Sequence, residues 1–432
     1  MSHGAYLQSL ELIGVKLGLE QIRALVAALG HPDRAFPSIV IAGTNGKGSV
    51  TAMVERGLRA AGYRTGRYTS PHLVDLHERF AIGGRPISDD QLEEVAGRIR
   101  AAAASLPSPP TFFEATTALA LEVFRDEHVD VAVLEVGLGG RLDATNVVEP
   151  VGVAITAVDL DHEQYLGSTI EEIAGEKAGV IKPGALVVLA DNPPAVRRVV
   201  ATAAERVGAP LVFAPDGVET AWTMVEGRAR LTLATPRHRY GPVTLALRGR
   251  HQIANAVAAV RLLEELAARG TFEASPAAIV EGLTAVDWPA RLEYGFWRGR
   301  TVIVDGAHNP AGARALASYL VETYGRRLPL VVGVMRDKKI DAMLEAFAPA
   351  ASHFVFTAAA GSRAAAPHEL AAIARGVAPD VPIVEIASPA DALAHAVTLG
   401  DPIVVAGSLY LAGEVRARIW YPSTTAAPPA NV

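Results

Sequence analysis

Short apolar segments rich in β-branched residues alternate with longer stretches of helical periodicity along most of the chain. Strands that alternate with helices are typical of parallel sheets covered by helices on both faces. We therefore predict an α/β fold. The predicted strands cover residues Ser38–Ala42, 129–134, 151–156, 185–189, 301–304, 328–334, 353–356 and 402–405. The predicted helices include residues 48–61, 89–104, 113–126, 255–268 and Pro310–Tyr324.

Two regions interrupt this alternation. Residues 217–247 alternate around Glu226-Gly227 and around Tyr240-Gly241-Pro242, which predicts a small antiparallel insert. Near Asp287-Trp288-Pro289 a helical pattern ends and a new strand-rich series begins. We therefore expect a first domain over residues 1–288, with a mainly parallel sheet and the insert, and a smaller Rossmann-like α/β domain over 289–422. Residues 423–432, rich in Thr, Ala and Pro, are expected to be a disordered tail.

Bulk properties exclude several classes of protein. A chain of 432 residues is too long for one ordinary core, which supports two domains. Its net charge of −6 argues against a nucleic-acid-binding surface. There is no cysteine, hence no disulfide or thiolate metal site, and no apolar run has the roughly 20 residues needed to cross a bilayer. The start of the chain does not resemble a signal peptide. We expect a cytoplasmic protein.

A glycine-rich loop joins the first predicted strand to the first long helix. Backbone amides at a helix N-terminus are unpaired and attract anions, and glycine lets the backbone approach phosphate oxygens closely. Lys47 adds a charge for the β- and γ-phosphates, and a nearby hydroxyl can reach magnesium. We therefore predict a nucleotide-triphosphate loop rather than a plain glycine turn. Its residues are Gly43, Thr44, Asn45, Gly46, Lys47, Gly48 and Ser49.

This phosphate loop, residues 43–49, departs from the standard G-x-x-x-x-G-K-[ST] pattern at two positions. Ile41 stands where the first glycine belongs, and Gly48 separates the lysine from Ser49. A second glycine cluster follows Glu135, but Leu142 stands where a dinucleotide-binding fingerprint requires its third glycine. The sequence therefore favours a variant phosphate loop and argues against a Rossmann dehydrogenase.

Polar residues follow the ends of other predicted strands. Glu135 and Asp143 follow the strand at 129–134, and His162 follows the next one. Ligands collect at the carboxyl ends of parallel strands, so these side chains are placed to face one site. Glu135 could hold magnesium through an oxygen, whereas histidine is an unusual ligand for that ion. A carboxylate such as Glu135 after a strand could instead cap a helix or lie in a surface loop.

Two further residues have ordinary interpretations on physical grounds alone. Ser70 follows a short strand at 67–69, where it could supply a metal ligand or belong to a plain turn. Lys177 lies near the end of the predicted helix Ile170–Ala178, where its charge predicts a solvated lysine that complements the helix dipole.

Five segments occur in the order and with the residues of a known family. They read GTNGKGS, TSPHL, LEVGLGGRLDATN, DH-x-x-x-LG and EKAG. The set resembles the Mur-ligase superfamily and, more narrowly, the bifunctional dihydrofolate synthases/folylpolyglutamate synthases of bacteria. The resemblance implies that Lys177 is carbamylated, that Glu135 and His162 bind magnesium, and that Ser49 and Ser70 lie at the same metal.

The second half of the chain carries three more segments of this family. The segment HQIANA implies that Asn255 contacts ATP, and PARLE implies that Arg291 reaches a phosphate. The segment DGAHNP places Asp305 at the nucleotide and His308 near the incoming amino acid. An arginine on an interdomain linker can also close over developing phosphoryl charge. The resemblance thus implies catalytic roles for Lys47, Lys177 and His308.

Two segments resemble those that contact the pteridine substrate in bifunctional members. The aromatic pair among them could equally belong to the core at the head of a helix. The phosphate loop also arrives by residue 43, without the additional N-terminal domain of cell-wall Mur ligases. The residues of the two segments that resemble the pteridine contacts are Thr111, Phe112, Phe113, Glu114, Leu142, Asp143 and Ala144.

The implied reaction joins L-glutamate to dihydropteroate, to a reduced folate or to both, with ATP as co-substrate and Mg²⁺ as cofactor. We expect a monomer, with no nucleic-acid or membrane partner. Three alternatives stay open: another superfamily ligase with a different carboxylate acceptor, a regulatory P-loop NTPase, and a non-catalytic binding protein. Against the last, the chain retains Lys47, Glu135, His162 and Lys177.

Overall fold

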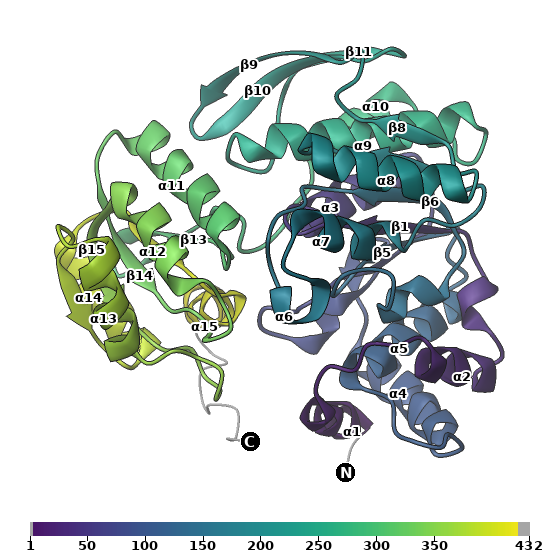
Figure 1. Ribbon diagram of the computed structural model, residues 1–432, viewed down its shortest axis with the longest axis horizontal. Helices are drawn as coiled ribbons and strands as arrows, with labels where there is room; N and C mark the ends of the chain where they lie inside the picture. The colour runs from purple at the N-terminus through teal and green to yellow at the C-terminus, as the bar shows by residue number, and fades with distance from the viewer. Residues whose placement is uncertain (1–2, 422–432) are drawn as a thin grey trace.

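The computed structural model describes residues 3–421, and the predicted tail at 423–432 lies outside them. The chain forms two lobes, each built on its own mixed sheet (Figure 1). The first lobe carries the purple to teal part of the chain and the second carries the green to yellow part (Figure 1). Within the described residues, no helix is long and apolar enough to span a membrane.

The first sheet has eight strands in the order β4-β3-β2-β5-β1-β6-β7-β8. The strands from β2 to β8 in this order are parallel, whereas β3 and β4 form an antiparallel edge. Because β1 pairs with β5 and β6, the ends of these three strands meet at one edge of the sheet. The strands are β1 Ser38–Ala42, β2 Thr65–Tyr68, β3 Phe80–Ile82, β4 Arg85–Pro86, β5 Val131–Glu135, β6 Pro150–Ile155, β7 Leu186–Leu189 and β8 Leu211–Phe213.

Helices cover both faces of this sheet, each over a separate apolar cluster. On one face lie α3 Lys47–Ala60, α9 His251–Ala268 and α10 Pro276–Thr284. On the other lie α1 His3–Ser9, α2 Glu20–Ala28, α4 Asp89–Ala103, α5 Phe112–Asp126, α7 Ile170–Ala178 and α8 Pro194–Arg206. A short helix, α6 Glu163–Leu166, follows β6. The central strands are buried on both faces, so their sequences are continuous apolar runs.

The predicted antiparallel insert is present as β9 Glu219–Val225, β10 Arg228–Ala234 and β11 Arg239–Thr244. Its first turn is at Glu226 and Gly227, which both have positive φ, as predicted. The prediction of a second reversal at residues 240–242 is wrong, because these residues lie inside β11. The chain reverses at 235–238 instead, where the Thr235 hydroxyl accepts the amides of Arg237 and His238.

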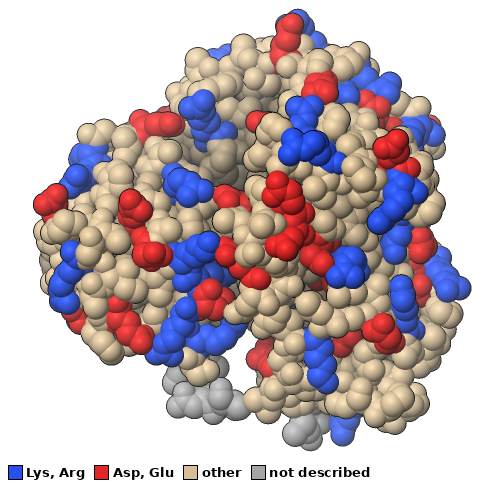
Figure 2. Space-filling view, in the orientation of Figure 1, with Lys and Arg blue, Asp and Glu red and all other residues tan. Residues whose placement is uncertain are grey.

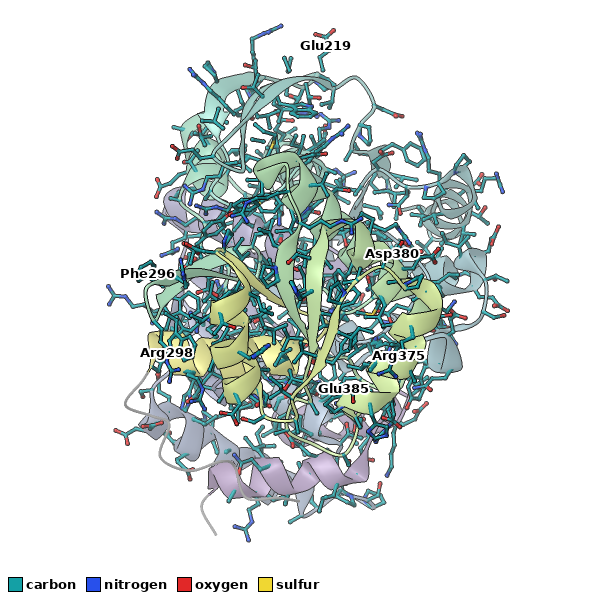
Figure 3. All side chains as sticks on the ribbon, turned by 90° about the vertical axis from the view of Figure 1, so that its left-hand side faces the viewer. Glu219, Phe296, Arg298, Arg375, Asp380 and Glu385 are labelled. Atoms are coloured by element: carbon teal, nitrogen blue, oxygen red, sulfur yellow. The ribbon has the colours of Figure 1, made fainter. Side chains whose placement is uncertain are left out.

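The second lobe has a six-stranded sheet in the order β12-β13-β17-β14-β15-β16, parallel except for β12. Figure 3 views this lobe from its outer side, where Phe296 and Arg298 project from the β12–β13 hairpin. These two sheets confirm the predicted α/β class. The strands are β12 Glu293–Trp297, β13 Arg300–Val304, β14 Leu328–Val332, β15 Ala351–Phe356, β16 Ile383–Glu385 and β17 Ile403–Ala406. The helices are α11 Pro310–Tyr324, α12 Ile340–Phe347, α13 Pro367–Val377, α14 Pro389–Leu399 and α15 Leu409–Trp420.

Candidate functional site

The phosphate loop connects β1 to α3 and is held by the end of the neighbouring strand β6. The amides of Thr44 and Asn45 donate to the Ala157 carbonyl at 2.8 and 3.2 Å, and Thr156 Oγ1 donates to the Asn45 carbonyl at 2.8 Å. Gly43 has φ 147°, and a side-chain carbon there would lie 1.8 Å from Thr156 Oγ1. Only glycine fits at this position, so the sequence of the loop and its attachment to β6 determine its path.

Two lysines converge on this loop. Lys47 Nζ donates to the carbonyls of Gly43 and Thr44, each at 3.2 Å, and Lys177 Nζ donates to the Gly43 carbonyl at 2.9 Å. Burial lowers the pKa of both amines, and burial together with the charge of Lys47 brings that of Lys177 to about 7. The interpretation of Lys177 as a solvated lysine is therefore wrong, because the packing of α7 under the loop buries it.

Glu135 ends β5 beside the loop and is buried. Its carboxylate accepts the Ser70 amide at 3.3 Å. Burial raises its pKa, while the charges of Lys47 and Arg291 act in the opposite direction. Ser70 thus lies beside Glu135 and contacts it through its backbone amide.

A magnesium ion fits part of this donor set. The Glu135 carboxylate and the Ser49 hydroxyl offer oxygen atoms, which the ion prefers. Among residues 3–421 no group of three or more Asp, Glu, His or Cys residues could hold a metal by itself. Magnesium commonly takes several of its ligands from nucleotide phosphates and water.

Helix α9 closes another side of the loop. Asn255 lies against Gly46, where a side-chain carbon would be 2.4 Å from Asn255 Oδ1. Gln252 Nε2 donates to Ser49 Oγ at 3.3 Å, and its own Oε1 accepts from Asn255 Nδ2 at 2.9 Å. The structure therefore brings Asn255 to the loop. Sequence reasoning missed Gln252, although it lies in the same HQIANA segment.

The two lobes meet in a polar contact around Asp161, which follows β6. Its carboxylate accepts from Lys338 Nζ at 2.6 Å and from Asn309 Nδ2 at 3.0 Å, and His308 Nε2 lies 3.9 Å away. Asn309 also reaches Asn45 of the phosphate loop, with its Nδ2 donating at 3.1 Å. Figure 2 shows basic side chains of one lobe facing acidic side chains of the other. We call this contact the seam: Asn45, Asp161 and His162 of the first lobe with His308, Asn309 and Lys338 of the second.

The seam controls the charge of its titratable groups. Burial opposes ionisation of Asp161, but the Lys338 charge and the two neighbouring histidines hold its pKa well below the usual range. Burial, together with the charge of Lys338, lowers the pKa of His162 and His308 to about 4, against the raising effect of Asp161. Both rings are neutral at pH 7. A hollow of about 210 Å³ opens beside Asp161, His162 and Lys338.

Lys338 was not predicted, and its position affects one expected ligand. Its Nζ lies 3.2 Å from His162 Nε2, so in this conformation that nitrogen accepts a hydrogen bond from Lys338. Lys338 follows the predicted strand 328–334, where strand-end logic applied to the second sheet would have pointed to it. Asp161 and Asn309 stood in quoted segments but were not named as site residues.

The linker between the lobes carries Arg291. Its Nη1 donates to the Ala290 carbonyl at 2.9 Å, and its charge is close enough to affect the pKa of Lys47 and Glu135. The two oxygens of Asp305 accept the amides of Leu292 and Ala307, each at 2.9 Å. Asp305 therefore anchors the linker to the end of β13, and this use of both oxygens is structural.

The residues expected at the pteridine divide into two groups. Thr111 and Glu114 form a capping box at the start of α5, and Asp143 accepts from the Leu138 amide and from Thr145, so these three have structural partners. Of the others, Phe112 and Phe113 are partly exposed and Ala144 is buried. Phe112 lies under Arg79, 5.0 Å from its guanidinium carbon, and Phe113 packs against Gly137. Leu142 is also partly exposed.

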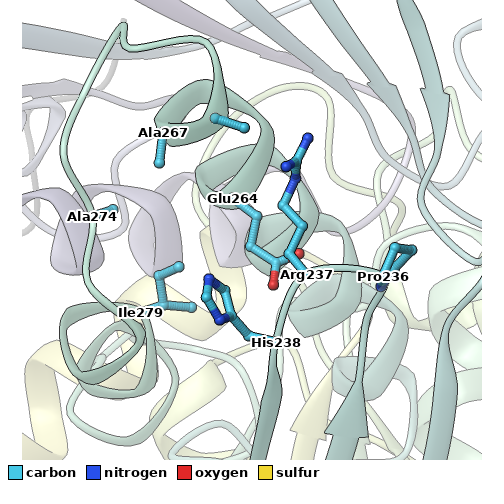
Figure 4. A pocket seen from close by; sticks show the side chains of 8 residues that line it. Pro236, Arg237, His238, Glu264, Ala267, Ala274 and Ile279 are labelled. Carbon is cyan, nitrogen blue, oxygen red and sulfur yellow. The ribbon is translucent and has the colours of Figure 1, made fainter.

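A larger hollow of about 410 Å³ lies elsewhere, between the β10–β11 turn and helices α9 and α10 (Figure 4). Glu264 faces it beside Arg237 and His238. The Glu264 carboxylate already accepts from Thr235 Oγ1 at 2.6 Å and from the Tyr240 hydroxyl at 2.9 Å. No predicted site residue lines this hollow, and its carboxylate has its partners within the fold.

Comparison with known proteins accounts for both lobes. Residues 41–263 match the Mur ligase middle domain, and residues 290–409 match the Mur ligase glutamate ligase domain. A dihydrofolate synthase/folylpolyglutamate synthase of Bacillus subtilis is 37% identical over 339 residues, which cover 77% of this chain and 79% of that protein.

Solved structures agree over nearly the full length. The folylpolyglutamate synthase of Mycobacterium tuberculosis complexed with ADP superimposes with a TM-score of 0.88 at 35% identity, covering 96% of this chain and 98% of that one. Escherichia coli FolC in complex with DHPP and ADP gives a TM-score of 0.85 at 28% identity, covering 96% and 97%. The chain belongs to the Mur ligase family, in its branch of dihydrofolate synthases and folylpolyglutamate synthases, and is an ATP-dependent ligase.

Proposed function

We propose that this enzyme joins L-glutamate to dihydropteroate, to the γ-carboxylate of a reduced folate, or to both, through an acyl phosphate. One observation carries the proposal: the phosphate loop with Lys47, Lys177 and Glu135 lies against the seam that brings in His308 and its neighbours. Relatives solved in complex with ADP, and with AMPPCP and folate, support a nucleotide and a pteridine as substrates.

In the first step a carboxylate oxygen of the pteridine substrate attacks the γ-phosphorus of ATP, and the bond to the β,γ-bridging oxygen breaks. The products are an acyl phosphate and ADP. Lys47 and the amides of the phosphate loop hold the phosphates, and Arg291 lies near enough to stabilise the charge that develops. Magnesium, held by Glu135 and Ser49, would supply further neutralisation of the β- and γ-phosphates.

In the second step the amine of L-glutamate attacks the acyl carbon, phosphate leaves, and the nitrogen loses a proton as the amide forms. We assign His308 as the group that accepts this proton. Its Nδ1 lies 2.8 Å from the Gly306 carbonyl, which can only accept, so Nδ1 carries the hydrogen and Nε2 has a free lone pair. Its lowered pKa of about 4 keeps this ring neutral at pH 7.

Carbamylation of Lys177 is part of the proposal. A pKa of about 7 keeps a large share of the amine neutral near neutral pH. The neutral amine adds CO₂ to form a carbamate and releases one proton. The resulting anion would lie between Lys47 and the phosphate loop, where it could position the metal and Lys47. Intact mass measured with and without bicarbonate tests for this adduct.

The test of the proposed substrate is phosphate release from ATP in the presence of L-glutamate, with dihydropteroate or a reduced folate as acceptor. We expect release to depend on both glutamate and a pteridine, and mass spectrometry to show the added glutamate. Release without any acceptor would instead indicate a regulatory NTPase. Stimulation by a different carboxylate, with none by either pteridine, would indicate another ligase of the superfamily.

A further inference from the structure

The glycine that follows Lys47 has a structural reason outside the nucleotide. In the standard phosphate loop this position is serine or threonine, so bound phosphate tolerates a side-chain carbon there. Gly48 lies in the first turn of α3, and its φ is not in the left-handed region. Neither phosphate nor backbone conformation therefore requires glycine at position 48.

The indole of Trp288 fills the space beside Gly48. A side-chain carbon at position 48 would lie 2.7 Å from Trp288 Nε1 and 3.0 Å from two carbons of the same ring. Real Cβ atoms do not approach so closely, so either the indole or the helix would have to move. Trp288 stands three residues before Arg291 on the linker. The contact therefore joins the phosphate-binding turn to the segment that carries Arg291.

Arg67 of β2 holds the indole from a second direction. Its guanidinium carbon lies 4.9 Å from the centroid of the Trp288 ring, a distance at which cation–π attraction acts. The Arg67 side chain is 15% exposed, and its ionic partner Glu55 is 3.9 Å away. Trp288 is thus fixed between a buried cation and the N-terminus of α3, which limits the positions open to the linker.

We propose that Trp288 is a positioning residue that couples occupancy of the phosphate loop to the placement of Arg291. The proposal rests on the proposed role of residues 43–49 in binding ATP. Phosphate binding orders the first turn of α3, and the indole transmits that order to the linker through its contact with Gly48. Glycine is present at position 48 because a larger residue would displace Trp288.

A double-mutant cycle tests the contact. We expect Gly48→Ala to lower kcat about tenfold, although alanine is the better helix former, because the displaced linker misplaces Arg291. Trp288→Leu should lower kcat to a similar extent while the Kd of ADP changes less than about threefold. In the double variant the indole is gone, so adding Gly48→Ala should cost nothing further. Additive losses, or an unaffected Gly48→Ala, would overturn the proposal.

Tryptophan fluorescence gives a readout that a purely structural role would not move. We expect ADP to change the emission of the wild-type enzyme and of Trp222→Phe, whose indole is 37% exposed in the insert. Trp288→Phe should bind ADP by calorimetry but lose that change. An undiminished signal in Trp288→Phe would refute the coupling. The phosphate-loop assignment would be refuted instead if the wild type does not bind ADP, or if Lys47→Met binds it unaltered. Thermal unfolding checks that each variant is folded.

Discussion

The phosphate loop and the seam lie next to each other but are held in different ways. The loop is fixed by backbone hydrogen bonds and tight glycine contacts within the first lobe, as at Gly43 against Thr156. The seam is made almost wholly of side-chain contacts between lobes, centred on Asp161 and Lys338. Backbone contacts of the first kind preorganise a site, whereas a few polar side-chain contacts can break and form again.

This difference separates two tasks of a ligase. The phosphates need a grip that does not reorganise during transfer, and the loop provides one. The acyl phosphate must be protected from water, and the amino acid must still enter, which suits a contact that opens and closes. We therefore expect changes in the loop to affect phosphate transfer itself. Changes in the seam should affect capture of the second substrate and closure.

The largest effect is expected for Lys47→Met. Loss of this charge at the phosphates should lower kcat/KM by about 10²- to 10³-fold, the usual consequence of removing one donor to a developing oxyanion. Stability should not fall, because burial already lowers the pKa of this amine and the variant removes a partly buried charge. Steady-state phosphate release and thermal unfolding measure the two. Lys16→Met, at an exposed position, is the control and should behave as wild type.

Lys177→Met is expected to lose about 100-fold in kcat with a smaller change in ATP affinity, because it removes an anchor of the metal and Lys47. In the wild type, activity in bicarbonate should rise with pH through about 7, because the amine is neutral above that pKa. The folded pKa lies below the ordinary 10.5, so without carbamylation stability should also rise from about pH 7 to 10.5. Chemical denaturation across that range measures it. If Lys177→Met keeps the same pH profile, Lys177 is not its source.

The seam offers a matched pair of neighbouring lysines. Lys338→Met should raise the KM for glutamate or lower kcat by about tenfold, because it leaves the buried Asp161 carboxylate without its cation. Lys339 pairs with Glu163 on the surface and is 49% exposed, so Lys339→Met should stay within about threefold of wild type.

The same variant makes a prediction about charge. Lys338 lowers the pKa of His162, so its removal should raise that pKa from about 4 toward 6.5, which an NMR titration can follow. Small-angle scattering with an ATP analogue and the pteridine should show less closure in Lys338→Met than in Lys339→Met. Equal behaviour of the two variants in all three measurements would show that Lys338 has no role in closure beyond that of the exposed Lys339–Glu163 pair.

The contrast between the two regions also explains what the sequence could predict. The eight predicted strands, the helices Ile170–Ala178 and Pro310–Tyr324, and the turn of the phosphate loop depend on neighbouring residues, so local patterns revealed them. The short strands β3, β4, β8 and β16 were not predicted. The seam depends on how two lobes pack. The position of Lys338 after a strand could mark it as a candidate, but no local pattern reveals that it meets Asp161 of the other lobe. The burial of Lys177 follows in the same way from the packing of α7 under the loop.

A local signal was nevertheless available at the segment predicted to contact the pteridine. Thr111-x-x-Glu114 has the spacing of a capping box, and the structure contains one: Thr111 Oγ1 accepts the Glu114 amide at 3.2 Å, and Glu114 accepts the Thr111 amide at 2.8 Å. The resemblance directed attention to substrate contact, whereas helix capping accounts for these two residues on its own. The role of Phe112 between them stays a prediction.

The smallest effects are expected in this segment, and they separate capping from substrate contact. Thr111→Val should cost about 1 kcal/mol of stability through loss of the cap, with the KM for pteridine unchanged. Phe112→Ala should raise the KM for pteridine a few-fold, consistent with the roughly 0.5–1.5 kcal/mol of an aromatic contact, and leave the Kd of ADP unaltered. Phe112 is the better candidate because its partly exposed ring lies under Arg79 at the surface of the first lobe. If Phe112→Ala loses stability but keeps the KM of the wild type, the aromatic pair belongs to the core, and the pteridine must bind through other residues.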